Sequence, residues 1–269
     1  MYESFFGLSE SPFNVTPDPR FIYFSRHHQE ALSALLYGVE QRRGFIQMTG
    51  EIGAGKTTLC RTLLQRLGEK VHSALVFNPR LSEFEMLQVI VEDFGIHPEG
   101  KKKKDYFDAL NRFLLEEAEK GNNAIVVIDE AQLLTPRMLE QIRLLSNLET
   151  NTKKLLQIIL FGQPELKDIL KRRDLLQLRQ RISVRYHLPA LMREEISNYI
   201  AHRLKVAGAQ ENFFTLEAMG LIFELSTGIP RIINMLADRA MLAAFAQGSK
   251  TIEESMVAAA QTDLEGVCA

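Results

Sequence analysis

A glycine-rich segment, Gly50–Thr57, constrains this chain more than any other feature. Its sequence, GEIGAGKT, fits the pattern G-x-x-x-x-G-K-[ST] at every fixed position. Residues 44–49 before it predict a short buried strand, and residues 58–67 after it predict a helix. Strand, glycine loop and helix in this order predict a phosphate-binding loop. Glycines let the backbone turn its N–H groups inward, and the new helix adds its positive dipole end.

The same segment predicts which groups hold the nucleotide. We expect ATP or ADP to bind with Mg²⁺, with the Lys56 amine reaching the β- and γ-phosphates and the Thr57 hydroxyl ligating the metal. A plain glycine turn between a strand and a helix is the alternative, and the complete motif match disfavours it. The residues predicted to bind the nucleotide are Gly50, Gly53, Ala54, Gly55, Lys56, Thr57 and Thr58.

The composition excludes several other classes of protein. A net charge of −2 gives no global basic field of the kind that nucleic-acid-binding proteins carry. Cys60 and Cys268 have no metal-ligand spacing, and we expect Cys60 to be a core residue in a reducing compartment. The N-terminus lacks the pattern of a signal peptide, and no stretch approaches the ~20 apolar residues that span a bilayer. We therefore expect the chain as given to be soluble.

Two carboxylates follow a second buried strand. Residues 124–128 are all apolar, which fits a central parallel strand, and Asp129 and Glu130 come directly after them. The carboxyl ends of parallel strands are where α/β sheets carry their chemistry. Following a phosphate-binding loop, this pair predicts that Asp129 holds Mg²⁺ and that Glu130 polarises the attacking water. A strand that merely ends in polar residues is the alternative.

The remaining pattern separates an α/β region from a helical one. Residues 74–79, 155–161 and 182–188 predict further strands, the first ended by Pro79, whereas helices are predicted over 192–207, 215–226, 230–247 and 251–262. The change predicts a boundary at 188/189, with a P-loop α/β domain over 1–188 and a helical domain over 189–269. The proline- and phenylalanine-rich residues 1–25 predict an irregular segment that either walls the nucleotide base or packs on the sheet edge.

Three further positions are candidates for the site. Gln163 follows the strand at 155–161, where a polar side chain could sense the γ-phosphate, although an ordinary turn residue is the alternative. Pro230 suits the first turn of a helix, so Arg231 is predicted at a helix start facing the nucleotide. A run of lysines, residues 101–104, could form a phosphate-binding patch, and we favour a solvated loop because no arginine or aromatic residue accompanies it.

Together these residues resemble the AAA+ ATPases. The resemblance implies a P-loop AAA+ α/β fold with a five-stranded parallel sheet in the order 5-1-4-3-2 and a C-terminal all-helical lid. It implies that Glu130 is the catalytic base, Gln163 the first sensor and Arg231 the second. It further implies a homo-oligomer in which Arg179 or Arg181 is a finger that reaches a neighbour's nucleotide. We lean to Arg179, and a shift of the helix by one residue would exchange the two.

A narrower resemblance rests on the N-terminal segment and on the residues around Glu130. The runs FFGL, PF, TPDPRF, ALLYG and DEAQ look like the cytoplasmic ATPase domain of general secretion pathway protein A (GspA, also called ExeA) and related MshM-type ATPases of type IV pilus biogenesis. This implies an ATPase on the cytoplasmic side of the bacterial inner membrane that assists assembly of a type II secretion (secretin) or type IV pilus machine. A membrane contact is expected only through a partner or a segment absent from this chain.

Two other functions stay open at this point. A DNA-associated AAA+ ATPase of the transposition-regulator type would share this core and lid, although the net charge argues weakly against DNA as a partner. A nucleotide-dependent scaffold, in which slow hydrolysis acts only as a timer, is also compatible with these residues.

Overall fold

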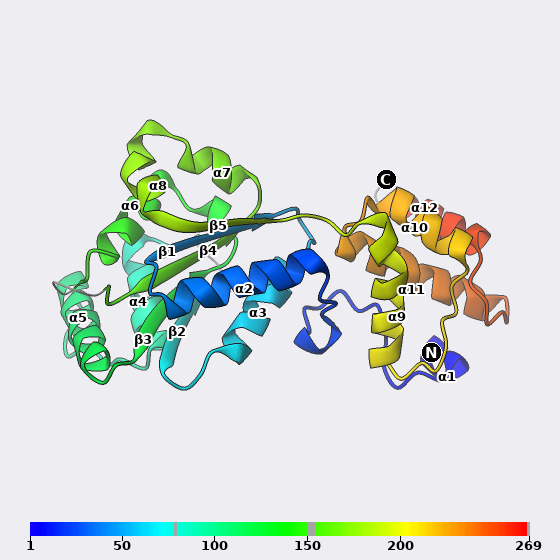
Figure 1. Cartoon of the computed structure of the whole chain (residues 1–269), viewed down its shortest axis with the longest axis horizontal. Coiled ribbons are helices and arrows are strands. Elements are labelled where there is room, and N and C mark those ends of the chain that lie inside the picture. Colours follow the sequence, from blue (N-terminus) through cyan, green and yellow to red (C-terminus); the bar gives the residue numbers. More distant parts are fainter. Residues whose placement is uncertain (78–79, 150–153, 268–269) are drawn as a thin grey trace. The chain divides into compact units, whose positions relative to one another are not determined.

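The computed structural model describes residues 1–77, 80–149 and 154–267 (Figure 1). Pro79 and Cys268, both named from the sequence, lie outside the described residues. The chain divides into two compact units. One consists of residues 29–50 and 60–188, here called the sheet unit, and the other of residues 1–28, 51–59 and 189–269, here called the helical unit.

The sheet unit is built on five parallel strands. They are β1 (Phe45–Gly50), β2 (Val71–Val76), β3 (Asn123–Ile128), β4 (Gln157–Gly162) and β5 (Ile182–Leu188). Their order is β2-β3-β4-β1-β5, which confirms the predicted sheet and its strand order. The strand β2 begins three residues before the apolar run that predicted it. It is an edge strand with half-buried positions, so polar His72 and Ser73 fit where a central strand would exclude them.

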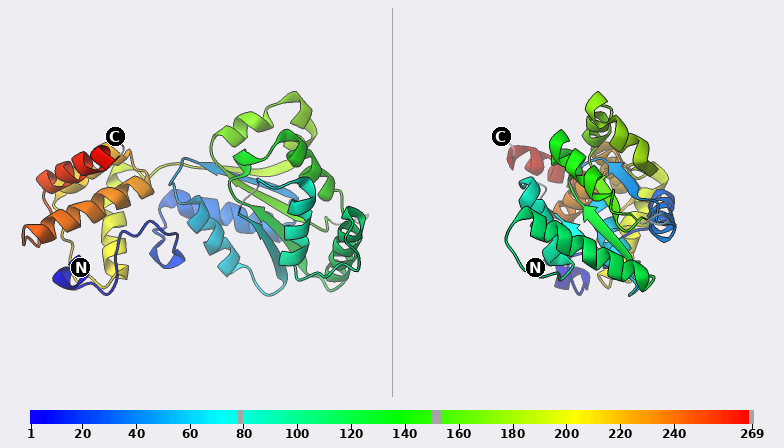
Figure 2. Two further views of the ribbon diagram at one scale, coloured as in Figure 1. Left: turned by 180° about the vertical axis from the view of Figure 1, so that it is seen from behind. Right: turned by 90° about the vertical axis from the view of Figure 1, so that its left-hand side faces the viewer.

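Helices cover both faces of this sheet, and β3 shows how. Ala124, Val126 and Ile128 point into one large core that is completed by α4 (Glu83–Asp93), α5 (Lys103–Glu119), α6 (Pro136–Leu145), α7 (Glu165–Leu170) and α8 (Leu176–Arg181). The opposite face is covered by α2 (Arg26–Glu40), which lies in front of the strands in Figure 1 and behind them in the left view of Figure 2. Gly38 allows α2 to approach closely, since a Cβ there would lie 2.5 Å from Ile46 Cδ1.

A buried carboxylate, that of Glu117, accepts hydrogen bonds at the C-terminal end of α5. Asn122 Nδ2 and Lys120 Nζ each donate to the Glu117 carboxylate at 2.6 Å. These hydrogen bonds, that of Asn122 first, lower the pKa of Glu117 to about 2. The C-terminal turn of α5 therefore depends on Glu117 remaining ionised.

The helical unit contains the predicted C-terminal helices and, in addition, the N-terminal segment. Its helices are α1 (Tyr2–Phe6), α9 (Ile196–Val206), α10 (Leu216–Ser226), α11 (Pro230–Ala246) and α12 (Glu254–Val267), with the short 3-10 turns η1 (Pro19–Phe21) and η4 (Arg193–Glu195). Figure 1 shows α1 beside α11. No helix among the described residues is long and apolar enough to cross a membrane.

The placement of residues 1–28 differs from the division of the chain at 188/189. Phe6 packs on Phe213 with ring centroids 4.8 Å apart, and Phe13 packs edge-on against Phe214 at 5.8 Å. Arg203 of α9, almost fully buried, anchors the same segment through backbone carbonyls, at 2.6 Å from that of Pro12. The aromatic residues thus complete the core of the C-terminal helices, which differs from the alternative of packing on the sheet edge.

Candidate functional site

The glycine loop forms a tight turn between β1 and α3 (Lys56–Arg66). Gly53 and Gly55 have φ of +79° and +94°, a region that other residues rarely adopt. The side chain of Lys56 folds back onto the loop, where its Nζ donates to the Glu51 carbonyl at 2.9 Å. The residue is only 6% exposed. A buried ammonium group above a curled backbone can bind an anionic group such as a phosphate.

A buried histidine braces the loop. His28 Nδ1 lies 2.8 Å from the Ser25 hydroxyl, and the ring also forms a hydrogen bond with the backbone of Ala54. An ideal Cβ on Gly55 would lie 3.3 Å from His28 Nε2, so the glycine leaves room for the ring. Burial lowers the pKa of His28, which keeps the ring neutral near pH 7. His28 was not predicted from the sequence. Its only sequence signal is Ser25, a residue type that often caps a helix, whose hydroxyl accepts the backbone N–H of His28 at 3.3 Å.

The first turn of α11 meets the same loop. Pro230 is the first residue of α11, as predicted, and the Arg231 N–H donates to the Gly53 carbonyl at 3.2 Å. The contact is close enough that a Cβ on Gly53 would lie 2.5 Å from Arg231 Cβ. Arg231 is therefore held at the glycine loop through its backbone.

Asp129 and Glu130 follow β3 at the edge of the sheet where β1 and β4 also end. Asp129 is buried, and its carboxylate accepts the backbone N–H of Glu130 at 2.9 Å. Glu130 has φ of +53°, so its backbone is in the left-handed region that disfavours a residue with a side chain. Gln163, at the end of β4, donates from Nε2 to Glu130 Oε2 at 3.1 Å. Strand order thus brings together a candidate metal ligand, a candidate base and a candidate sensor.

The two candidate finger arginines differ in what they contact. Arg181 donates to Ser146 Oγ at 3.1 Å and to Asn147 Oδ1 at 2.5 Å, so it is held by its own subunit. Arg179 is half-exposed, and no hydrogen bond or ion pair within the described part of the chain engages its side chain. Of the two, Arg179 is better placed to reach another molecule.

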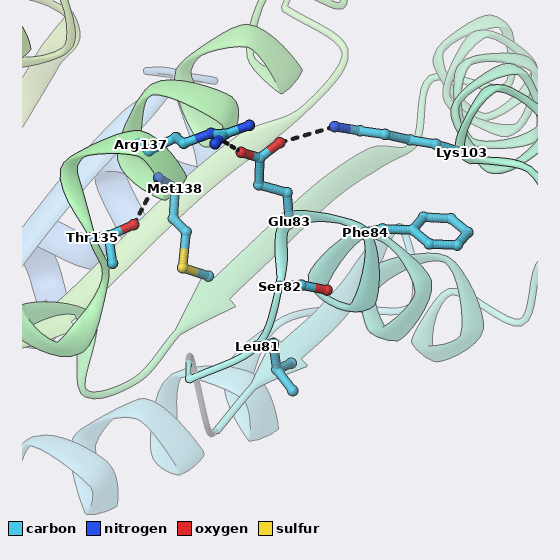
Figure 3. Close-up of a pocket in the computed structure, with 8 residues that line it drawn as sticks. All are labelled: Leu81, Ser82, Glu83, Phe84, Lys103, Thr135, Arg137 and Met138. Carbon is cyan, nitrogen blue, oxygen red and sulfur yellow. Dashed lines mark hydrogen bonds and ion pairs between the residues drawn. The ribbon is translucent and has the colours of Figure 1, made fainter.

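One lysine of the run, Lys103, lines a pocket of about 450 Å³ in the sheet unit (Figure 3). The Glu83 carboxylate lies between Lys103 Nζ at 3.0 Å and Arg137 Nε at 2.6 Å. The Lys103 hydrogen bond, with Arg137, lowers the pKa of Glu83. Two of the cations at this pocket are therefore already offset by a carboxylate of the same chain.

Comparisons with known proteins match the part of the chain that contains the glycine loop. A family model described as an AAA domain matches residues 39–170. The chain is 44% identical over 268 residues to general secretion pathway protein A of Aeromonas hydrophila, covering 99% of this chain and 49% of that protein. The chain thus spans about half the length of this curated relative, to which it is similar along almost all of its own residues.

Solved structures share the fold at low identity. The ORC2 protein of Aeropyrum pernix, in its ADPNP–ADP complexes, has a TM-score of 0.71 and 19% identity, covering 96% of this chain and 72% of that chain. The Walker-type ATPase of Pyrococcus abyssi has a TM-score of 0.67 and 18% identity, covering 96% of this chain and 77% of that chain. These neighbours show that the chain has the fold of such ATPases.

Proposed function

We propose that this AAA+ ATPase, similar to general secretion pathway protein A, hydrolyses ATP to assist assembly of a bacterial envelope secretion or type IV pilus machine. The observation that carries the proposal is the 44% identity along 99% of the chain, together with the curled glycine loop that the same residues form. The chain covers about half of that relative, so the partner and the place of action are inferred. We infer an inner-membrane partner, reached from the cytoplasmic side.

The glycine loop would hold the phosphates. The backbone N–H groups from Gly53 to Thr57 and the amine of Lys56, which now contacts the Glu51 carbonyl, would replace water around the phosphate oxygens. No cluster of three or more metal-binding side chains occurs among the described residues. Mg²⁺ keeps several waters and needs few protein ligands beside the phosphates. The Thr57 hydroxyl and the buried Asp129 carboxylate would hold it, and bound Mg²⁺ would neutralise charge on the phosphate oxygens.

The chain's other residues would position the reacting groups. Glu130 would accept a hydrogen bond from the attacking water and orient it, and Gln163, its neighbour at 3.1 Å, would contact the γ-phosphate. Arg231, held at Gly53, would contact the same phosphate from its own subunit. Arg179 would supply positive charge to a neighbouring subunit's nucleotide in a homo-oligomer, because Arg181 is already bound to Ser146.

Calorimetry of two variants tests this assignment. Lys56→Ala should abolish measurable ATP binding, because it removes a buried cation from the glycine loop, whereas Lys101→Ala, which removes an exposed lysine of the run at 101–104, should bind normally. Undiminished affinity of Lys56→Ala would reject the phosphate site.

Glu130→Gln should bind ATP with wild-type affinity and hydrolyse it at least ~100-fold more slowly, since a positioned base contributes on this scale. Wild-type turnover would reject the role of Glu130.

A DNA-associated ATPase is the second candidate, and the exposed lysines at 101–104 are the observation that favours it. The ion pair of Lys103 with Glu83 reduces the charge available to a phosphate backbone. A titration with duplex DNA at several salt concentrations separates the two functions, because affinity for DNA falls steeply with salt when lysines contact phosphates. Salt-dependent binding that Lys101→Ala weakens would favour this second function.

A further inference from the structure

Gln132 joins the two segments that carry the candidate base and the candidate sensor. It lies in the short 3-10 turn η2 (Ala131–Leu133), directly after Glu130. Its Nε2 donates to Glu130 Oε2 at 2.5 Å, and its Oε1 accepts the backbone N–H of Gln163 at 3.0 Å. One amide side chain therefore spans from the end of β3 to the end of β4.

The neighbouring backbone leaves room for this bridge. Gly162 ends β4, and an ideal Cβ at this position would lie 3.1 Å from Gln132 Oε1 and 2.8 Å from Leu166 Cδ2. A side chain at residue 162 would therefore require small shifts of both Gln132 and Leu166.

The two glutamine amides act on the same carboxylate oxygen. Gln163 and Gln132 both donate to Glu130 Oε2, at 3.1 Å and 2.5 Å. No hydrogen bond among the described residues engages Glu130 Oε1. The carboxylate is therefore oriented through one oxygen, and the lone pairs of the other can accept a hydrogen bond from a water molecule.

We propose that Gln132 is a positioning residue that holds Glu130 through Oε2 while the Gln163 amide turns to the γ-phosphate. The proposal rests on the roles given above to Glu130 and Gln163. A turn of the Gln163 side chain would take its amide donor from Glu130, but the donor from Gln132 would stay. The Gln132 Oε1 contact with the Gln163 backbone would also remain, because it does not involve the Gln163 side chain.

The backbone of Glu130 explains why such support is needed. Its φ of +53° is unfavourable for a residue with a side chain, so the surrounding contacts must hold it there. The Asp129 carboxylate restrains the backbone by accepting the Glu130 N–H, and Gln132 restrains the side chain. Loss of the Gln132 amide would free the carboxylate to rotate, while the glycine loop would be unchanged in sequence.

The test compares Gln132→Ala and Gln132→Glu with Gln41→Ala, which removes an exposed glutamine at the end of α2. ATP affinity is measured by calorimetry, turnover by phosphate release and folding by thermal melting. Both Gln132 variants should bind ATP within about 3-fold of wild type and turn it over at least ~10-fold more slowly, as expected for a misplaced catalytic group. Gln132→Glu keeps the acceptor for the Gln163 N–H but replaces the donor by a second carboxylate, so its turnover should not recover.

A double-mutant cycle with Gln163→Ala measures whether the two amides share one oxygen. Their effects on turnover should be non-additive, because both act on Glu130 Oε2. Wild-type turnover in Gln132→Ala would overturn the proposal. A loss of turnover that a loss of ATP affinity and a lower melting temperature fully account for would also overturn it. If Glu130→Gln is inactive and Gln132→Ala is fully active, the inference about Gln132 fails and the proposed function stands. If Glu130→Gln is fully active, both fail.

Discussion

Replacing Gly53 by alanine perturbs the glycine loop at the point where the first turn of α11 meets it. The structure gives two separate penalties for this one methyl group. With φ of +79°, an alanine at this position adopts a left-handed backbone that costs about 1–2 kcal/mol. Its Cβ would also lie 2.5 Å from Arg231 Cβ and 3.3 Å from Ile229 Cγ2, so α11 or the loop must shift.

The second penalty can be isolated by a matched control. Gly248 has φ of +66° and lies in the same helical unit, but a Cβ there would have no atom within 4 Å. Gly248→Ala therefore has the backbone penalty alone. Both variants gain the same stabilisation through a stiffer unfolded chain, so this effect cancels between them. We expect Gly53→Ala to be less stable than Gly248→Ala by about 1–3 kcal/mol, the range for an overpacked contact.

Urea unfolding without nucleotide, followed by ATP calorimetry on the same samples, measures both consequences. Gly53→Ala should bind ATP more weakly than wild type, because its loop carbonyl can no longer accept the Arg231 N–H at 3.2 Å without displacement. Gly248→Ala should bind ATP as wild type does. Equal stabilities of the two variants, with full ATP affinity in both, would refute the close approach of Arg231 to Gly53 and the argument built on it.

Two other predictions concern charged groups. Arg179→Ala should lower turnover at high protein concentration by ~10³-fold or more with ATP affinity retained, as removal of an arginine finger does. Arg181→Ala should instead lower the melting temperature, because Arg181 is bound within its own subunit. A loss of ATP affinity in Arg179→Ala would place that side chain in its own subunit's site. Glu117, with its pKa lowered to about 2, contributes stability that is complete above its unfolded pKa of about 4.3 and is lost as the pH falls toward 2. The free energy of unfolding in urea should therefore fall more steeply between pH 5 and 3 for wild type than for Glu117→Gln. Glu116→Gln, which changes an exposed neighbour, should follow wild type.

The sheet could be predicted because its signals are local. The apolar run before Asp129 and the glycine motif after β1 each fix a strand and the side chain that follows it, and parallel strands bring such ends to one edge. The strand order itself came from a resemblance, since nothing in a single strand's sequence states which neighbour it pairs with. The edge strand β2 was predicted to begin late, because half-buried positions tolerate polar residues and weaken the periodic signal.

The N-terminal segment could not be placed from the sequence, because its contacts are far away along the chain. Phe13 meets Phe214, and Pro12 is held by Arg203, so the partners lie roughly 190–200 residues apart. An apolar residue indicates that its side chain will be buried, but it does not indicate which residues it will pack against. The same limit hid His28, whose partner in the glycine loop is some 26 residues distant and consists of backbone.

Two hydrogen bonds of the glycine loop bear on what ATP must do to bind. Lys56 donates to the Glu51 carbonyl, and the Gly53 carbonyl accepts the Arg231 N–H. The Lys56 ammonium group has three N–H donors, and even if phosphate binding breaks the first of these bonds, the net loss is about 0.5–1.5 kcal/mol for a typical hydrogen bond. By the usual relation this is at most about tenfold in affinity, far less than a buried ammonium gains from a phosphate. The second bond can survive, because it uses a carbonyl that phosphate cannot contact favourably. We therefore expect Lys56 to be the part of the loop that responds to nucleotide, and Gly53 with Arg231 to be the part that stays.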